Sequence, residues 1–145
     1  MIQLEPIGPD NWRLGGLQVA DGQKKFVAAP MTLLARAYAY RERRSTALVI
    51  RSGGEPVGMA LYHDGAGVDA FILSQFFIDE RWQGRGFGLE AARQVLERMR
   101  QDGTFAKVLL CYVEGDEPAR RMYEKLGFRP TGERDGDEIE MEKTL

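Results

Sequence analysis

The fold of this chain is decided by residues 71–99, which read FILSQFFIDERWQGRGFGLEAARQVLERM. Residues 71–78 are rich in aromatic and branched side chains and have the length of a β-strand. A turn with three glycines follows at 83–88. In the segment after the turn, apolar residues recur every three or four positions, as on one face of a helix: Leu89, Ala92, Leu96 and Met99. The stretch predicts a strand, a glycine-rich turn and a helix in succession.

This succession is suited to binding an anion. A helix N-terminus carries unpaired N–H groups and the positive end of the helix dipole. Glycines let the backbone approach a bulky phosphate, and Arg85 adds a fork of donors that fits phosphate oxygens. A turn that binds nothing is the alternative, but the alternating glycines and Arg85 favour phosphate. The turn is not a P-loop, because no Gly-Lys-Ser/Thr follows, and no second βαβ unit completes a Rossmann fold.

Composition narrows the class of protein. The chain has 145 residues, 43% hydrophobic and 29% charged, which is ordinary for one soluble domain, 1–145, with one core. The net charge of −2 argues against a general nucleic-acid surface. No apolar run is long enough for a membrane span, and the first residues lack a signal-peptide core. With one cysteine, Cys111, and one histidine, His63, we expect a cytoplasmic protein without a structural metal.

The segments before residue 71 predict a strand, helices and a hairpin. A strand is expected over 2–7, and short helices are expected to start at Asp10 and Asp21. A longer helix over 30–40 places three apolar residues on one face: Met31, Leu34 and Tyr38. The arginines near its end are expected to interact with the helix C-terminus, and contact with an acidic ligand is the alternative: Arg36, Arg41, Arg43 and Arg44.

Antiparallel strands over 47–51 and 56–63 lead into the strand of 68–78. His63 lies at a strand end. It is expected to be a solvated side chain, with a general base as the less favoured reading.

The C-terminal half predicts strand, helix and hairpin. Residues 106–113 form a nearly continuous apolar run, which is typical of a buried parallel strand and would bury Cys111. Pro118 stands at the start of a helix that ends at Gly127. The acidic residues of the terminal hairpin, within 133–142, are expected to form a solvated face, and attraction of a cationic substrate is the alternative.

Two motifs in this order of elements resemble the GNAT superfamily of N-acetyltransferases. Gln83-Gly84-Arg85-Gly86-Phe87-Gly88 matches the coenzyme A pyrophosphate loop of that family, Arg/Gln-x-x-Gly-x-Gly/Ala. Asp116-x-x-Ala119-x-x-Met122-Tyr123-x-x-x-Gly127-Phe128 matches its Asn-x-x-Ala-x-x-Leu-Tyr-x-x-x-Gly-Phe motif. Within the family, residues 74–78 followed by 83–86 look like the polyamine acetyltransferases. The region of Trp12, residues 25–27 and the ending at 132–141 are similar to the bacterial spermine/spermidine acetyltransferases.

The resemblance implies an α+β fold. Its sheet would be mixed and mostly antiparallel, with about seven strands, about four flanking helices and a splayed acetyl-CoA cleft. It implies transfer of an acetyl group from acetyl-CoA to a primary amine of a small substrate, for example a polyamine such as spermidine or spermine. No metal, nucleic acid or membrane takes part in this reaction, and the family allows a homodimer. An acyl-CoA-binding regulatory module and a peptide N-acetyltransferase are the competing readings.

The resemblance also assigns residues. Tyr123 would be the general acid for the thiolate, and the backbone of Phe76, Phe77 and Ile78 would pair with the pantetheine arm. The pyrophosphate would lie on the glycine turn: Gln83, Gly84, Arg85, Gly86, Phe87, Gly88 and Leu89.

Two positions depart from the pattern of the family. Asp116 stands where the family has an Asn that contacts the coenzyme. The position of Asp116 in the motif implies the same contact, but an ionised Asp lacks the N–H₂ donor of Asn. Ser74 and Gln75 stand where related animal enzymes have acids, which leaves the base unnamed. Other acids that could reach the site are Glu42, Asp69, Asp79 and Glu80.

Overall fold

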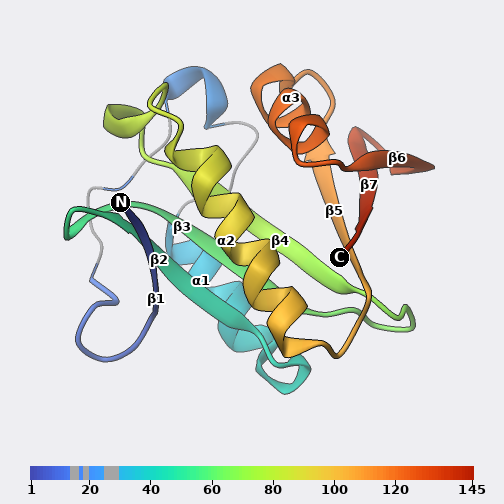
Figure 1. Ribbon diagram of the computed structural model, residues 1–145, viewed down its shortest axis with the longest axis horizontal. Coiled ribbons are helices and arrows are strands. Elements are labelled where there is room, and N and C mark those ends of the chain that lie inside the picture. The colour runs from blue at the N-terminus through green and yellow to red at the C-terminus, as the bar shows by residue number, and fades with distance from the viewer. Residues whose placement is uncertain (14–16, 18–19, 25–29) are drawn as a thin grey trace.

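The computed structural model describes residues 1–13, 17, 20–24 and 30–145, and its centre is one seven-stranded sheet (Figure 1). The strand order is β1-β2-β3-β4-β5-β7-β6. Neighbouring strands are antiparallel, except that β4 and β5 are parallel. The strands are β1 (Ile2–Pro6), β2 (Thr46–Ser52), β3 (Glu55–Asp64), β4 (Phe71–Ile78), β5 (Lys107–Val113), β6 (Arg129–Asp135) and β7 (Glu138–Thr144). The predicted mixed, mostly antiparallel sheet is confirmed.

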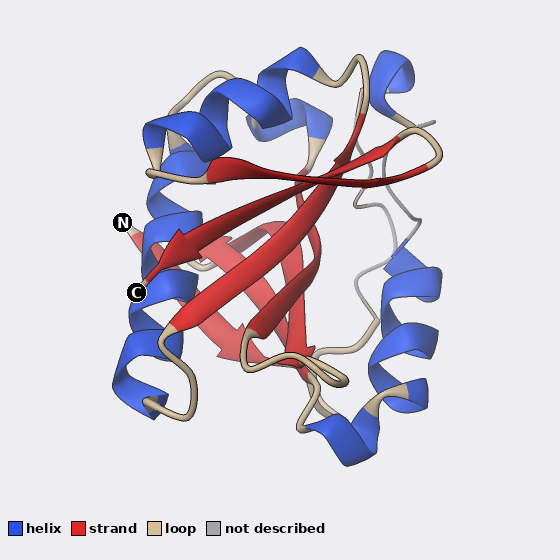
Figure 2. Ribbon diagram, turned by 90° about the vertical axis from the view of Figure 1, so that its right-hand side faces the viewer, coloured by secondary structure: helices blue, strands red, loops and turns tan. Residues whose placement is uncertain are grey.

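Helices cover both faces of this sheet. Figure 1 shows α2 crossing the near face with α1 behind the sheet, and Figure 2 shows helices on both sides of the strands. The described helices are α1 (Pro30–Ala39), α2 (Phe87–Asp102) and α3 (Glu117–Lys125), with short 3-10 helices η1 (Asp21–Gln23), η2 (Arg41–Arg43) and η3 (Glu80–Trp82).

The N-terminal helices differ from expectation. From Pro9 to Asn11 the chain forms turns rather than the helix predicted to start at Asp10, and the later part of that prediction lies largely outside the described residues. The helix predicted from Asp21 is seen as the short η1, and its continuation to Phe26 also lies outside them.

The prediction for the buried face of α1 is wrong for two of its three residues and holds for Leu34. Met31 and Tyr38 are 66% and 68% exposed, whereas Leu33 is fully buried. Leu33 packs with Met59, Leu61 and Phe77 in a small core on this side of the sheet, and Leu34 and Ala37 contact the same core. Leu33 and Ala37 are four residues apart, so they form a second apolar stripe, and the sheet selects it.

The helix α2 follows the prediction closely. Its buried face consists of Ala91, Ala92, Val95, Leu96 and Met99, which belong to the main core between the helix and the sheet. Gly103 ends the helix in the left-handed conformation, and its N–H donates to the carbonyl of Met99 over 3.1 Å. This helix connects β4 to β5, so it fixes where those two parallel strands meet.

The two parallel strands pair over only part of their length. Residues 71–73 of β4 are in register with 108–110 of β5. Beyond this point β4 stays paired with β3 as far as Ile78, and β5 stays paired with β7 as far as Val113. The sheet therefore opens into a cleft between two half-sheets. Cys111 lies on β5 just past the last pair, and for this reason it is exposed rather than buried as expected.

Candidate active site

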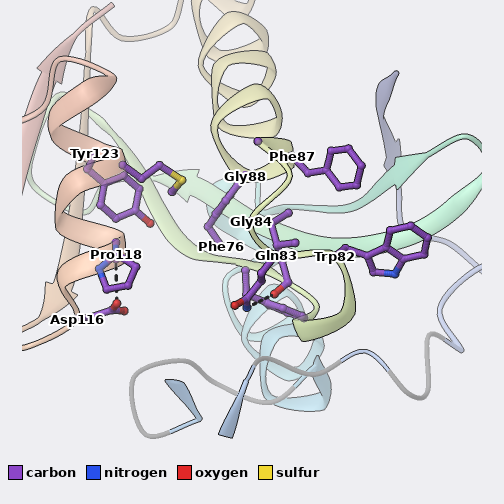
Figure 3. A pocket seen from close by; sticks show the side chains of 14 residues that line it. Phe76, Trp82, Gln83, Gly84, Phe87, Gly88, Asp116, Pro118 and Tyr123 are labelled. Atoms are coloured by element: carbon purple, nitrogen blue, oxygen red, sulfur yellow. Dashed lines mark hydrogen bonds between the residues drawn. The ribbon is translucent and has the colours of Figure 1, made fainter. Parts of the chain in front are cut away.

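Two cavities meet where β4 and β5 separate. The first, of about 310 Å³, lies between the end of β4, the glycine turn and α3 (Figure 3). Its lining comes from residues far apart in the sequence: Phe76, Phe77, Ile78, Trp82, Gln83, Gly84, Gly86, Phe87, Gly88, Asp116, Pro118, Ala119, Met122 and Tyr123. The parts of the predicted strand, turn and C-terminal helix thus lie around one hollow.

The glycine turn leaves its backbone open. Gly84 and Gly86 have φ of +77° and +80°, which side chains rarely adopt, and a Cβ at either position would contact nothing within 4 Å. Gly86 is the N-cap of α2, and no side chain caps this end of the helix. The turn is anchored by Gln83, whose Nε2 donates to the carbonyl of Ile78 over 2.8 Å (Figure 3). An uncapped helix N-terminus behind left-handed glycines is suited to an anion.

Two predicted loop residues do not line this cavity. Arg85 lies with its guanidinium 5.0 Å from the centre of the Trp82 ring. Trp82 is 6.3 Å from Phe87, and Figure 3 shows both rings on the side of the glycine turn away from Tyr123. Leu89 packs against the main core. The hollow is therefore formed by the glycines, Gln83 and Phe87 rather than by the whole predicted segment.

The second cavity is larger, about 670 Å³, and continues from the first through the opening in the sheet. It is lined by the diverging parts of β4 and β5, by Arg36 of α1 and by four carboxylates of the C-terminal hairpin. Four residues line both cavities: Phe76, Asp116, Ala119 and Tyr123. The two cavities are thus one continuous cleft, with Asp116 and Tyr123 at the junction.

Tyr123 is held firmly at this junction. Its side chain is 7% exposed, and its ring packs edge-on against Phe128 with centroids 5.7 Å apart. Within the described part of the chain its hydroxyl has no hydrogen-bond partner. Burial, and to a lesser extent the charge of Asp116, raises the pKa of Tyr123 well above its ordinary value. The hydroxyl therefore stays protonated and is available as a donor to a group that enters the cleft.

Asp116 begins α3 and faces the cleft at the same time. Its Oδ1 accepts from the N–H of Ala119 over 3.3 Å, so it is the N-cap of the helix (Figure 3). The residue is only 7% exposed, and this burial raises the pKa of its carboxyl group. A carboxylate with a raised pKa is a better proton acceptor than an ordinary surface Asp.

The other candidate acids lie outside both cavities. Asp79 is fully buried beside the turn, where its Oδ1 accepts from Nε of Arg81 over 2.8 Å. Glu42, Asp69 and Glu80 line neither cavity.

His63 lies away from the cleft. It is buried rather than solvated, stacked on Tyr40 with ring centroids 4.5 Å apart, and its Nδ1 is 2.8 Å from the carbonyl of Asp64. The expectation of a solvated side chain is wrong, because the ring of Tyr40 covers it.

Part of the cleft lining comes from residues for which the sequence analysis gave ligand contact only as the less favoured alternative. Arg36 reaches from α1 to donate to Oγ of Ser74 over 3.2 Å, and the acidic hairpin residues face the cleft. A period-two reading of the hairpin would have placed Glu138 and Glu140 on one face.

No group of three or more His, Cys, Asp or Glu side chains in the described ranges is arranged to hold a metal ion. In those same ranges, no helix is both long enough and apolar enough to span a bilayer.

Comparison with known proteins places this geometry in a family. The profile of the acetyltransferase (GNAT) family matches residues 16–128. The chain therefore belongs to the acetyltransferase (GNAT) family. A spermine/spermidine N(1)-acetyltransferase of Bacillus subtilis (strain 168) is 31% identical over 88 residues, 57% of this chain and 58% of that protein. The chain thus spans less than two thirds of the length of this curated relative.

Solved structures share the fold. A crystal structure of the aminoglycoside acetyltransferase AAC(6')-Ib in complex with coenzyme A superposes with a TM-score of 0.80 at 19% identity, over 99% of this chain and 95% of that one. An acetyltransferase of Bacillus subtilis in complex with CoA gives 0.72 at 15% identity, over 100% and 99% of the two chains. A GNAT acetyltransferase from Elizabethkingia anophelis with acetyl-CoA bound gives 0.69 at 14% identity, over 99% and 98%.

Proposed function

We propose that this protein transfers the acetyl group of acetyl-CoA to a primary amine of a small substrate. The observation that carries the proposal is the continuous cleft at the opening of the sheet, with the open glycine turn at one side and the hydroxyl of the buried Tyr123 at its junction. Family membership supports it, as do three structures of the same fold that contain coenzyme A or acetyl-CoA.

In this proposal two parts of the coenzyme contact the smaller cavity, the pantetheine arm and the pyrophosphate. The edge of β4 at Phe76, Phe77 and Ile78 is free of β5, so its backbone can pair with the amides of the pantetheine arm. The pyrophosphate lies on the N-terminus of α2, held by backbone N–H groups of Gly84, Gly86, Phe87, Gly88 and Leu89. Gln83 braces the turn through its bond to Ile78, and Arg85 supplies positive charge beside it.

The reaction needs two proton movements. The neutral amine attacks the thioester carbonyl, the C–N bond forms and the C–S bond breaks. Tyr123 donates to the leaving sulfur. Because its pKa lies above that of a thiol, Tyr123 first stabilises the thiolate by a hydrogen bond. The sulfur then leaves as the thiol with the Tyr123 proton, and the proton lost by the amine restores the hydroxyl. Asp116 is the carboxylate that both cavities share, and in our proposal it takes the proton of the amine, directly or through water. Ser74 and Gln75 cannot take this role at neutral pH.

A polyamine is the acceptor that we propose. The support is the curated relative named a spermine/spermidine N(1)-acetyltransferase, whose match covers 58% of its length. The acidic lining of the larger cavity is consistent with a cationic amine.

Release of thiol from acetyl-CoA tests the proposal, with spermidine, spermine, a lysine-ended peptide and an aminoglycoside as acceptors. Tyr123→Phe is expected to lower kcat about 10²-fold, since it removes the donor and keeps the ring that packs on Phe128. Tyr112→Phe is the matched control, because Tyr112 also lines the larger cavity, and it is expected to change kcat less than about threefold. Coenzyme binding without turnover of any amine would instead identify a coenzyme-binding module.

A further inference from the structure

Four carboxylates form one wall of the larger cavity. They come from the end of β6, the turn and the start of β7, and we call them the acidic wall: Asp135, Asp137, Glu138 and Glu140. The expectation that these side chains form only a solvated face is therefore incomplete, because all four line the cleft.

The register of the hairpin explains why three of them gather on one face. Asp135 lies opposite Glu138 across β6 and β7, and Glu138 and Glu140 are two residues apart on one strand. Side chains two apart on a strand share a face, and so do residues directly opposite each other. On the neighbouring strand, Cys111 lies opposite Glu140. Although Cys111 is exposed to the cleft, partial desolvation by the surrounding strands raises the pKa of its thiol, and the negative charges of Glu138, Glu140 and Asp135 raise it further.

No Lys or Arg among the described residues forms an ion pair with this wall, although the charge of Asp137 acts on Arg134 and helps to raise its pKa. Arg134, the nearest arginine in sequence, forms its ion pair with Glu114 at 2.8 Å, and Lys107 pairs with Glu142 at 3.5 Å. Within the described residues none of the four carboxylates forms an ion pair, and Glu140 accepts from the hydroxyl of Thr131 over 2.9 Å. Like charges opposite each other destabilise a hairpin, so the arrangement is unfavourable in the free protein. A bound cation would turn this electrostatic repulsion among the carboxylates into a net attraction and so stabilise the hairpin.

A second, independent feature marks this cavity as a ligand site. Tyr123 is 7% exposed and lines it, and its hydroxyl has no hydrogen-bond partner among the described residues, so the hydroxyl is available to a ligand or water in the cavity. Arg36 is the one Lys or Arg among the described residues lining the cavity, and it is held at Ser74 on β4. The cleft thus has a reacting junction at Tyr123 and a separate anionic wall on the hairpin.

We infer that the acidic wall binds a second cationic nitrogen of the acceptor, so that the protein prefers an aliphatic amine with at least two cationic centres over a monoamine. This inference rests on the proposed function, because one nitrogen must reach the acetyl group while another lies at the wall. A single ammonium group would leave the wall unpaired when its nitrogen reaches the junction. The wall therefore determines acceptor specificity, and it does not take part in the chemical step.

Steady-state kinetics with matched acceptors test the inference. We expect kcat/KM for 1,4-diaminobutane and spermidine to exceed that for butylamine, and the advantage to shrink as ionic strength rises. Glu138→Gln and Asp135→Asn should each raise KM for the diamine about three- to tenfold with little change in kcat, and they should raise KM for butylamine by a smaller factor. Glu133→Gln is the control, since Glu133 is exposed on the same hairpin but does not line the cleft, and it should change KM less than twofold.

Direct binding separates this inference from the proposed function. Calorimetry of 1,4-diaminobutane with the protein–CoA complex should show binding that Glu138→Gln weakens and Glu133→Gln does not. If no amine is acetylated but this pattern holds, the acidic wall stands and the proposed function falls. If butylamine and the diamine are acetylated equally well and the wall variants change neither kinetics nor binding, the inference is overturned while the acetyltransferase proposal stands.

Discussion

Asp116 combines two tasks that oppose each other at the level of a single residue. As the N-cap of α3 it is favoured in its charged form, because the helix dipole and the Ala119 N–H stabilise a carboxylate. Its burial at the junction of the two cavities disfavours the charge, and burial is the larger effect on its pKa. The charged form of Asp116 therefore lowers the stability of the folded protein at neutral pH. The proposed role of Asp116 as a proton acceptor in the cleft would explain this cost.

Asp116→Asn is expected to stabilise the free protein at neutral pH and to slow turnover. Asn keeps an oxygen for the Ala119 N–H. The folded-state pKa of Asp116 lies above the unfolded value near 3.9. The wild-type protein therefore loses unfolding free energy as the pH rises through the folded-state pKa, and it loses none at a pH below the unfolded value. The gain in Tm should thus be present at pH 8 and vanish below about pH 4. Thermal unfolding at both pH values measures it, and thiol release measures the expected fall in kcat.

Glu117→Gln is the control for this prediction. Glu117 is the exposed neighbour of Asp116, and its hydrogen bond to Arg120 lowers its pKa, so the stability it contributes is present at neutral pH and lost on acidification. Its replacement should lower Tm slightly at pH 8, opposite in sign to Asp116→Asn. A lower Tm for Asp116→Asn at pH 8 would contradict the account of its burial, and unchanged kcat would remove its role as proton acceptor.

At the scale of elements, the glycine turn and α2 form the unit that the sequence defines best. Its strand, its left-handed glycines and the end at Gly103 are readable locally, because each depends on residues within a few positions. The buried stripe of α1 was not readable in this way, since two apolar stripes compete and only contact with Met59, Leu61 and Phe77 decides between them. Cys111 was expected to be buried and the acidic hairpin to be only a solvated face for a similar reason, because their exposure to the cleft depends on where β4 leaves β5.

Gly86→Ala is expected to weaken coenzyme binding more than it weakens the fold. An alanine at a φ of +80° costs about 1–2 kcal/mol, although its Cβ would meet no neighbouring atom. Relaxation of this strain would turn the N–H groups of the turn away from the pyrophosphate, so we expect the Kd of CoA to rise about tenfold. Calorimetry with CoA and with pantetheine, which lacks the pyrophosphate, should show the loss for CoA alone.

Gly53→Ala supplies the comparison for the turn. Gly53 has a φ of +59° in the turn between β2 and β3, also in open space, so its replacement carries a similar strain far from the cleft. It should lower Tm by a similar amount and leave the Kd of CoA unchanged. Equal effects of Gly53→Ala and Gly86→Ala on CoA binding would show that the turn does not hold the pyrophosphate.

For the whole molecule, the important feature is that the sheet consists of two parts joined over a short distance. Strands β1 to β4 form one half-sheet and β5 to β7 the other, and the halves are in register only over residues 71–73 and 108–110. The cleft draws its lining from both halves, β4 and the glycine turn on one side and α3, β5 and the hairpin on the other. A ligand in the cleft therefore replaces contacts that the strands do not make with each other.

Coenzyme A is expected to stabilise the protein by bridging the two half-sheets. At a free concentration of about 100 Kd, binding to the folded state alone adds about 2.7 kcal/mol to the free energy of unfolding, which a rise in Tm reports. Hydrogen exchange should slow most at the diverging strand ends, residues 74–78 of β4 and 111–113 of β5, because the backbone groups facing the cleft have no partner across it. The hairpin of β2 and β3 is already paired along its length, apart from a register shift between Ile50 and Arg51, and should change little beyond the global effect. Slower exchange confined to the start of α2 would mean that the coenzyme binds at the glycine turn without joining the halves.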